Sequence, residues 1–287
     1  MGLLFIALSI SCSLSIAQIL KLAENRKLDV LKILVCNYLA GFLISLFNSK
    51  EFSVFPEVSP NPEIWLIILA GVLGITFIAN MVVYSRSIDR VGMGVSIAAM
   101  RMSLIFPIGI SLFVFGEAIG GFKYFGIILA LASLLLMVPR IKTKSISGFS
   151  DAWLPVLIFL MTGAADTGLK VYERLFSTQV SEDLFVSGIF FFSFLIGLGI
   201  LIKRKELHFS FTEIGYGIAT GIVNLYSSIF LLYALKLMPG SVVFPLVNVS
   251  LVVLGTLIGV WFWKDKPSIK QWSGLAVAII SIILLVG

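Results

Sequence analysis

Charged side chains are scarce in this chain, and the residues that usually build catalytic or metal sites are scarcer still. Of its 287 residues only 13% are charged, two are cysteine and one is histidine. Cys12 and Cys36 lie inside apolar stretches, and the lone His208 lies in a basic loop. The sequence therefore predicts no disulfide framework and no metal site.

Enzyme motifs are lacking as well. The chain has no Walker P-loop, so it does not hydrolyse ATP itself, and it has no nucleophile elbow and no catalytic histidine. We therefore expect that the protein is not an enzyme and that it carries no cofactor.

Apolar residues, by contrast, are abundant. They make up 59% of the chain, and the mean hydropathy is +1.08. A soluble domain does not need so much apolar surface, whereas a polytopic helical membrane protein does. Ten stretches have the length of about 17–25 residues that crosses a hydrocarbon core about 30 Å thick. These ten predicted spans are 3–21, 30–47, 64–85, 92–115, 122–138, 153–173, 184–202, 212–235, 241–263 and 270–286.

The sequence also repeats itself at a nearly constant spacing. Leu20-Lys21-x-x-Glu24 recurs as Leu169-Lys170-x-x-Glu173. Five further residues match others at an offset of 148: Gly92, Val95, Glu117, Gly126 and Ser133 align with Gly240, Val243, Asp265, Gly274 and Ser281.

Each half of the chain holds five spans, and this odd number makes the halves enter the bilayer from opposite sides. The predicted fold is an all-α polytopic membrane protein, with ten transmembrane helices arranged as two inverted five-helix repeats. The repeats cover residues 1–140 and 153–287, and residues 141–152 link them. Inverted repeats are typical of secondary transporters, with the substrate site where the halves meet.

Basic residues gather in the loops that follow odd-numbered spans. There they are Lys21, Arg26, Lys27, Lys32, Arg86, Arg90, Arg140, Lys142, Lys144, Lys203, Arg204, Lys205, Lys264, Lys266 and Lys270, against Lys50, Lys123, Lys170, Arg174 and Lys236 after even spans. By the positive-inside rule the odd loops are cytoplasmic, so both termini are non-cytoplasmic, and we expect the cell (inner) membrane as the location. The net charge of +6 then reflects topology and anionic headgroups of the lipid bilayer, and predicts no nucleic-acid partner.

Arg101 is the most informative side chain because it places a cation inside span 4, about 14 Å deep by helical rise. Such a charge costs at least about 2.5 kcal/mol. A carboxylate, a water-filled cavity or an anionic substrate must compensate it. The repeat counterpart of Arg101 is Val249, so the fold does not require a charge here. The alternative is an arginine that pairs with a carboxylate and only fixes helix packing.

Asp166 in span 6 is the natural partner of Arg101, and its repeat counterpart is the neutral Ala17. An ion pair with Arg101 is one interpretation, and a pair with Lys170, one helical turn further on, is another. A buried carboxylate can also carry a proton for coupling. Lys170 itself is interpreted as a span-end side chain that snorkels to the headgroups.

Other polar side chains inside the spans complete the predicted substrate site, although helix packing is the alternative for each. They are Asn80 and Tyr84 in span 3, Asn224 and Tyr226 in span 8, and Asn248 in span 9. Pro107 interrupts the hydrogen-bond ladder of span 4 and predicts a kink or gate.

Small residues favour close helix packing. The glycines of Gly217-x-x-x-Gly221 let helices approach either within the bundle or across a dimer seam, so a monomer and a homodimer both stay open.

The ten spans, and a span 4 that ends in Phe115-Gly116-Glu117 before a short glycine-containing span 5, resemble the drug/metabolite transporter superfamily, EamA type. In that pattern span 4 carries a proline in its second half, which matches Pro107, and an acidic residue closes the span, which matches Glu117. The second half departs from it, with Gly255 at the proline position and Asp265 as the acid.

The resemblance implies a basket of helices around a central cavity lined by spans 1, 3, 4, 6, 8 and 9. Members of the superfamily move amino acids, drugs, sugars, nucleotide sugars, organic phosphates or choline. Arg101 favours a small-molecule substrate with a carboxylate or phosphate group, above all an amino acid or another anionic or zwitterionic solute. We expect it to be carried by alternating access, with proton or exchange coupling. The alternatives are export of hydrophobic drugs or cations, where Phe106 and Tyr226 matter more, and a non-transporting membrane sensor or assembly protein.

Overall fold

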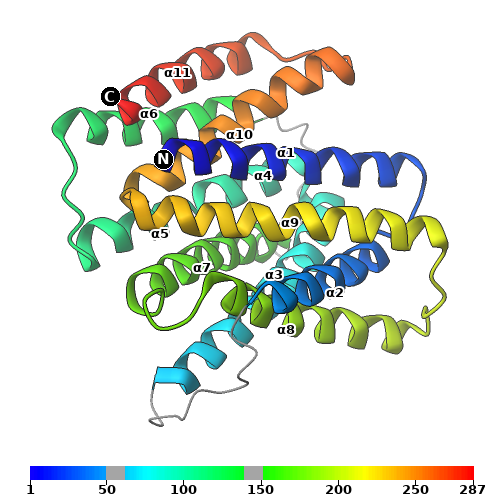
Figure 1. The fold of residues 1–287 in the computed structure, drawn as a ribbon. Helices are drawn as coiled ribbons and strands as arrows, with labels where there is room; N and C mark the ends of the chain where they lie inside the picture. Colours follow the sequence, from blue (N-terminus) through cyan, green and yellow to red (C-terminus); the bar gives the residue numbers. More distant parts are fainter. Residues whose placement is uncertain (50–61, 139–150) are drawn as a thin grey trace. The chain divides into compact units, whose positions relative to one another are not determined.

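The computed structural model describes residues 1–49, 62–138 and 151–287, and these residues form helices and no strand (Figure 1). The elements are α1 (Gly2–Asn25), α2 (Val30–Asn48), α3 (Pro62–Val91), α4 (Met93–Met102), α5 (Ile105–Gly109), the π-helical turn η1 (Ile110–Val114), α6 (Gly121–Met137), α7 (Trp153–Leu175), α8 (Glu182–Arg204), α9 (Phe211–Leu237), α10 (Gly240–Phe262) and α11 (Ile269–Val286). The predicted linker 141–152 lies outside the described residues except for its last two positions.

The helices have the length and composition of membrane spans. Within the described part of the chain, nine helical stretches have at least 18 residues and enough apolar character to cross a membrane. The 17-residue α6 is a shorter apolar helix at the place of the fifth predicted span. Backbone groups in hydrocarbon must be hydrogen-bonded within their own segment, which is why such stretches form helices. The predicted all-α polytopic membrane protein is confirmed.

The fourth predicted span is broken into three pieces. α4 ends at Met102, α5 begins at Ile105, and η1 completes the span. Pro107 explains the position of the break, because its ring excludes a hydrogen bond to the carbonyl of Ser103 and crowds that carbonyl. The predicted irregularity therefore exists, and it lies one turn before the proline, two residues after Arg101.

The chain forms two compact units, and each is described by itself. One comprises Met1, Leu3–Ile78 and Val171–Tyr233, and the other comprises Gly2, Ala79–Lys170 and Ala234–Gly287. Each unit contains residues from both halves of the sequence repeat, so packing units and repeats are different divisions of the chain.

In the first unit, α2 is a central packing element. The ring of Phe190 on α8 lies against Gly41 of α2, and its centroid is 5.6 Å from that of Tyr38. Gly217 and Gly221 of α9 lie against the backbone of α2, where a Cβ at Gly221 would come within 2.6 Å of the Asn37 carbonyl oxygen. The Gly217-x-x-x-Gly221 pair therefore serves packing inside this unit.

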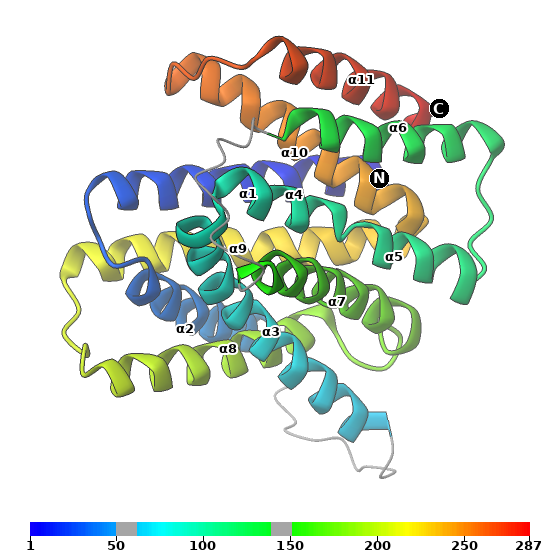
Figure 2. The same ribbon diagram turned by 180° about the vertical axis from the view of Figure 1, so that it is seen from behind.

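In the second unit, α6 and α11 lie side by side in both views (Figures 1 and 2). A Cβ at Gly126 of α6 would lie 3.0 Å from Leu285, and a Cβ at Gly274 of α11 would lie 2.7 Å from Met137. Gly126 and Gly274 are repeat counterparts, and so are Met137 and Leu285. The start of each helix meets the end of the other, so equivalent helices run antiparallel and make the same contact twice. Inverted repeats predict this arrangement.

Gly274→Ala should destabilise the protein by about 1–3 kcal/mol, because the added methyl would overpack a seam that includes the backbone of Met137. Gly126→Ala should cost less, since its nearest atoms are side-chain atoms of Leu285 and Leu284. Gly199→Ala in α8, with nothing within 4 Å of the new methyl, is the matched control. Thermal unfolding in detergent measures all three, and equal midpoints for Gly274→Ala and Gly199→Ala would contradict the close packing.

Candidate functional site

Arg101 is held by a neutral partner from the other half of the repeat. Its Nη1 donates a 2.8 Å hydrogen bond to Oδ1 of Asn248 on α10. The amide of Asn248 is fixed in this orientation because its Nδ2 donates to the Phe244 carbonyl at 3.1 Å. The Nε of Arg101 is buried and has no hydrogen-bond partner among the described residues. The guanidinium therefore keeps donor capacity that none of the described residues uses.

Asp166 lies near Arg101 without pairing to it. Asp166 and the hydroxyl of Tyr84 lie close enough to Arg101 to interact with it electrostatically, yet within the described ranges no salt bridge joins Asp166 to Arg101 or to Lys170. The expected ion pair is thus not formed in this structure, because Asn248 holds the guanidinium and Glu117 holds Lys170. Both Arg101 and Asp166 are partly exposed.

Asn80 on α3 extends the same polar group of side chains. Its Nδ2 donates to Oγ1 of Thr162 at 3.0 Å, one turn before Asp166 on α7. Its Oδ1 is buried, and no donor reaches it in the part of the chain that the structure describes. We call Asn80, Tyr84, Arg101, Asp166 and Asn248 the central polar cluster; all five belong to the second unit. They come from both repeats, on α3, α4, α7 and α10.

The broken span packs closely on α7 beside this cluster. Gly163 faces the ring of Phe106, which is the second residue of α5. The Phe106 ring also lies 4.9 Å from that of Phe159, centroid to centroid. Phe106 therefore anchors the segment after the break, and Pro107 beside it is buried.

The two remaining predicted site residues belong to the first unit. There Asn224 donates to Oδ1 of the buried Asn37 at 3.2 Å, and the ring of Tyr226 stacks on Phe230 with centroids 5.9 Å apart. Both contacts are the helix-packing alternative that the sequence leaves open.

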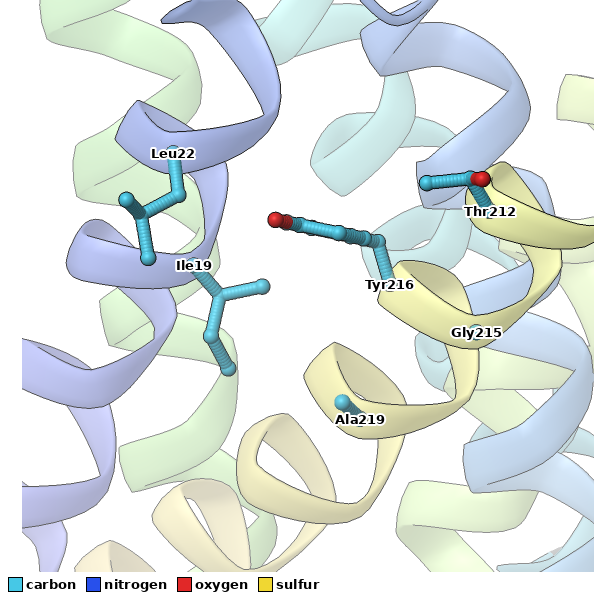
Figure 3. A pocket seen from close by; sticks show the side chains of 6 residues that line it. All are labelled: Ile19, Leu22, Thr212, Gly215, Tyr216 and Ala219. Carbon is cyan, nitrogen blue, oxygen red and sulfur yellow. The ribbon is translucent and has the colours of Figure 1, made fainter. Parts of the chain in front are cut away.

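The first unit also has an open groove between α1 and α9 (Figure 3). It has a volume of about 430 Å³ and is lined by Ile19, Leu22, Thr212, Gly215, Tyr216 and Ala219. The Tyr216 side chain reaches across it toward α1, and Arg26 lies 5.6 Å from the ring centroid. None of the predicted site residues lines this groove. The described residues also hold no group of three or more His, Cys, Asp or Glu side chains placed to bind a metal ion.

A second charged group of residues in the second unit is one that the sequence did not reveal. Oε1 of Glu117 accepts from Lys170 Nζ at 2.8 Å and from the Gly240 amide at 2.9 Å. Oε2 accepts from the Ser241 amide at 2.9 Å and from its hydroxyl at 2.8 Å. We call these four residues the Glu117 clamp. The carboxylate satisfies the first two amides of α10, where the helix dipole favours a negative charge.

Lys170 is therefore not a snorkelling residue, since its side chain is only 4% exposed. Its stem also packs against Gly240, where an added Cβ would lie 3.0 Å from Cδ and crowd the clamp. Two features of the sequence could have indicated the clamp: the lysine that recurs in both repeats, as Lys21 and Lys170, and the acidic residue that closes span 4. The span-end position suggested the lipid headgroups instead.

Burial disfavours the charged form of Glu117, but the hydrogen bonds from Lys170, Ser241 and Gly240 outweigh it and hold its pKa below the ordinary value. A carboxylate with a lowered pKa in the folded protein stabilises it above the ordinary pKa of about 4.3. That contribution disappears as the pH falls through the lowered value.

We expect the wild type to have a higher thermal midpoint than Glu117→Gln at neutral pH, where the charged clamp is intact. The difference should shrink as the pH falls below about 4.3, because protonated glutamate then resembles glutamine. Unfolding of both proteins in detergent between neutral and acidic pH measures this. A difference that does not depend on pH would show that the charge of Glu117 is not what stabilises the clamp.

Comparison with known proteins agrees with this architecture. Residues 154–287 match the EamA-like transporter family. An uncharacterized protein of Haemophilus influenzae is 24% identical over 96% of this chain and 95% of its own length. A probable 4-amino-4-deoxy-L-arabinose-phosphoundecaprenol flippase subunit ArnE of Proteus mirabilis is 30% identical over 71 residues, which are 24% of this chain and 62% of that protein.

A solved protein structure has the same fold over nearly the whole chain. It superposes with a TM-score of 0.70 at 15% identity and covers 99% of this chain and 95% of its own.

Proposed function

Because this chain belongs to the drug/metabolite transporter superfamily, we propose that it is a secondary carrier and not an enzyme. Its cargo is a small solute with a carboxylate or phosphate group, moved across the cell membrane by alternating access. The substrate site is the central polar cluster, where the two repeats meet within one unit. Arg101 binds the anionic group of the cargo.

The observation that carries this proposal is that, among the described residues, no salt bridge joins Arg101 to Asp166. A purely structural arginine would close a salt bridge with the carboxylate beside it, because a membrane charge is costly without compensation. Here a neutral amide holds the guanidinium, Nε has no hydrogen-bond partner in the described part of the chain, and both side chains are partly exposed. Opposite charges held apart in this way suit a cargo that has both a negative and a positive group, such as an amino acid.

Asp166 has two roles open to it in this scheme. It binds the ammonium group of a zwitterionic cargo, or it carries the proton that couples transport to the proton gradient. If the transport of every cargo requires Asp166, whatever the charge of the cargo, the proton role is favoured.

An organic phosphate is the second class of cargo. The ArnE relatives are named for a phosphate-linked amino-sugar lipid, and a guanidinium binds phosphate as well as it binds carboxylate. Export of hydrophobic drugs has less support, because Phe106 is used in packing against Gly163 and Phe159.

A thermal-shift screen of the detergent-purified protein against amino acids, organic phosphates, sugars and quaternary amines tests this assignment. We expect an amino acid or a phosphate ester to stabilise the wild type. Arg101→Ala should weaken its binding about 10- to 100-fold, since a charged hydrogen bond contributes about 1.5–3 kcal/mol. Asp166→Asn should weaken the binding of zwitterions more than that of simple anions.

Arg86→Ala is the matched control, because it removes an exposed arginine near the end of α3 and should leave binding unchanged. A ligand that binds Arg101→Ala and the wild type equally would make Arg101 a structural residue. Stabilisation by hydrophobic cations alone would favour the drug exporter, and a protein that binds none of the compounds would favour the sensor or assembly protein.

The proposed orientation places both termini outside the cytoplasm. Thr178 and Glu206 are exposed and lie in the loops on either side of α8. In a variant without Cys12 and Cys36, we expect Thr178→Cys to react with a membrane-impermeant maleimide in spheroplasts, and Glu206→Cys to react only after lysis. The reverse labelling pattern would invert the topology and place both termini in the cytoplasm.

A further inference from the structure

The loops that follow spans 4 and 9 have the same backbone conformation. Phe115 and its repeat counterpart Trp263 have φ, ψ of −91°, −4° and −99°, −3°. The next residues, Gly116 and Lys264, are both left-handed, with φ of 63° and 57°.

The acids that follow share this backbone geometry as well. The amide of Glu117 donates to the Ser111 carbonyl at 3.0 Å, and the amide of Asp265 donates to the Gly259 carbonyl at 3.0 Å. Ser111 and Gly259 are also counterparts at the offset of 148. The repeat thus places two carboxylates at equivalent points of the fold.

The two acids nevertheless do different things in this structure. Glu117 is held in its clamp, with its side chain 12% exposed, and caps α10, whose first residue is Gly240. Asp265 is exposed and folds back over Gly259, and among the described residues its side chain makes no hydrogen bond or ion pair. The place equivalent to the start of α10 is the start of α4, after Gly92, and among the described residues no hydrogen bond joins Asp265 to it. One of the two equivalent clamps is closed, and the other is open.

Each of these helix starts leads to one side of the central polar cluster. Asn248 lies eight residues after Gly240, and Arg101 lies nine residues after Gly92, which is about 12–14 Å along each helix. A carboxylate that caps or releases one helix therefore acts on the element that holds one member of the Arg101–Asn248 pair.

We propose that Glu117 and Asp265 are alternating gate residues, which cap α10 and α4 in opposite states of the carrier. The inference rests on the proposed transport function. In inverted repeats the two loops lie on opposite faces of the membrane, so closing one cap while opening the other exposes the cluster to one side at a time. The structure is the state in which the Glu117 cap is closed and the Asp265 cap is open.

Cysteine labelling of the purified full-length protein tests the closed cap. In a background without Cys12 and Cys36, Ser111→Cys is the reporter, since Ser111 is fully buried and its Oγ lies 2.6 Å from where a Cβ on Gly240 would be. We expect Glu117→Gln to raise its reaction rate with a water-soluble maleimide about tenfold, by shifting the population of states. Asp265→Asn, the matched control, should not raise it.

A second reporter, Lys266→Cys, tests the open cap next to the exposed Asp265. Glu117→Gln should slow its labelling about threefold or more as Asp265 caps α4, and adding Asp265→Asn should restore the rate. Lys170→Met, which removes one donor of the clamp, should reproduce the direction of both effects. Agreement of these four variants supports the alternation.

Three results would overturn the proposal. The first is no change at Ser111→Cys in either Glu117→Gln or Lys170→Met, both checked for a monodisperse fold. The second is an equal rise in Glu117→Gln and Asp265→Asn, which indicates general loosening. The third is no protection of Lys266→Cys. Labelling needs no substrate, so the two proposals can fail separately. If the labelling rates of the two reporters change in opposite directions but no ligand depends on Arg101, the proposed function is contradicted and the gate assignment is retained.

Discussion

A guanidinium inside an apolar span must have its charge compensated, and the arrangement around α4 follows from that requirement. Asn248 supplies an acceptor to Arg101, and the Phe244 carbonyl fixes the orientation of that amide. The break after Met102 lets α5 pack through Phe106 onto Gly163, next to Thr162 and Asp166 of α7. Three helices are thus positioned around one cation, and the described residues leave its Nε without an acceptor.

Symmetry and asymmetry serve separate ends in this chain. The symmetric elements are structural: the glycine contacts of α6 and α11 and the matching loops after spans 4 and 9. The asymmetric elements are charged: Arg101 faces no second arginine, because its counterpart is Val249, and Asp166 is matched by Ala17. The repeated scaffold therefore carries charged residues that occur in one half only.

The sequence predicts the helices well because hydrocarbon thickness fixes the length of an apolar span. The predicted spans 30–47 and 270–286 correspond to α2 at Val30–Asn48 and to α11 at Ile269–Val286. The break in span 4 could be placed only approximately, since the ring of Pro107 disturbs the turn before it.

The partners of the charged residues could not be read from the sequence. Lys170 has Glu173 one turn away on its own helix, whereas its observed partner Glu117 lies in a distant loop. The opposite charge of Asp166 makes it the expected partner of Arg101, yet the side-chain amide of Asn248 on α10 accepts the hydrogen bond instead. Such choices depend on which helix ends meet in space, and one sequence without an alignment does not contain that information.

The seam between α6 and α11 has the form of a two-fold symmetric homodimer interface inside one polypeptide. Gly126 contacts Leu285, and their repeat counterparts Gly274 and Met137 contact each other in the same way. In an assembly of two identical five-span chains, every charge would occur twice, and a second arginine would stand where Val249 is buried. When the two copies are joined in one chain, a charge in one half need not be repeated in the other. The two halves can then diverge at single positions while the seam holds them in register, which is what the proposed recognition of a cargo with two different ends requires.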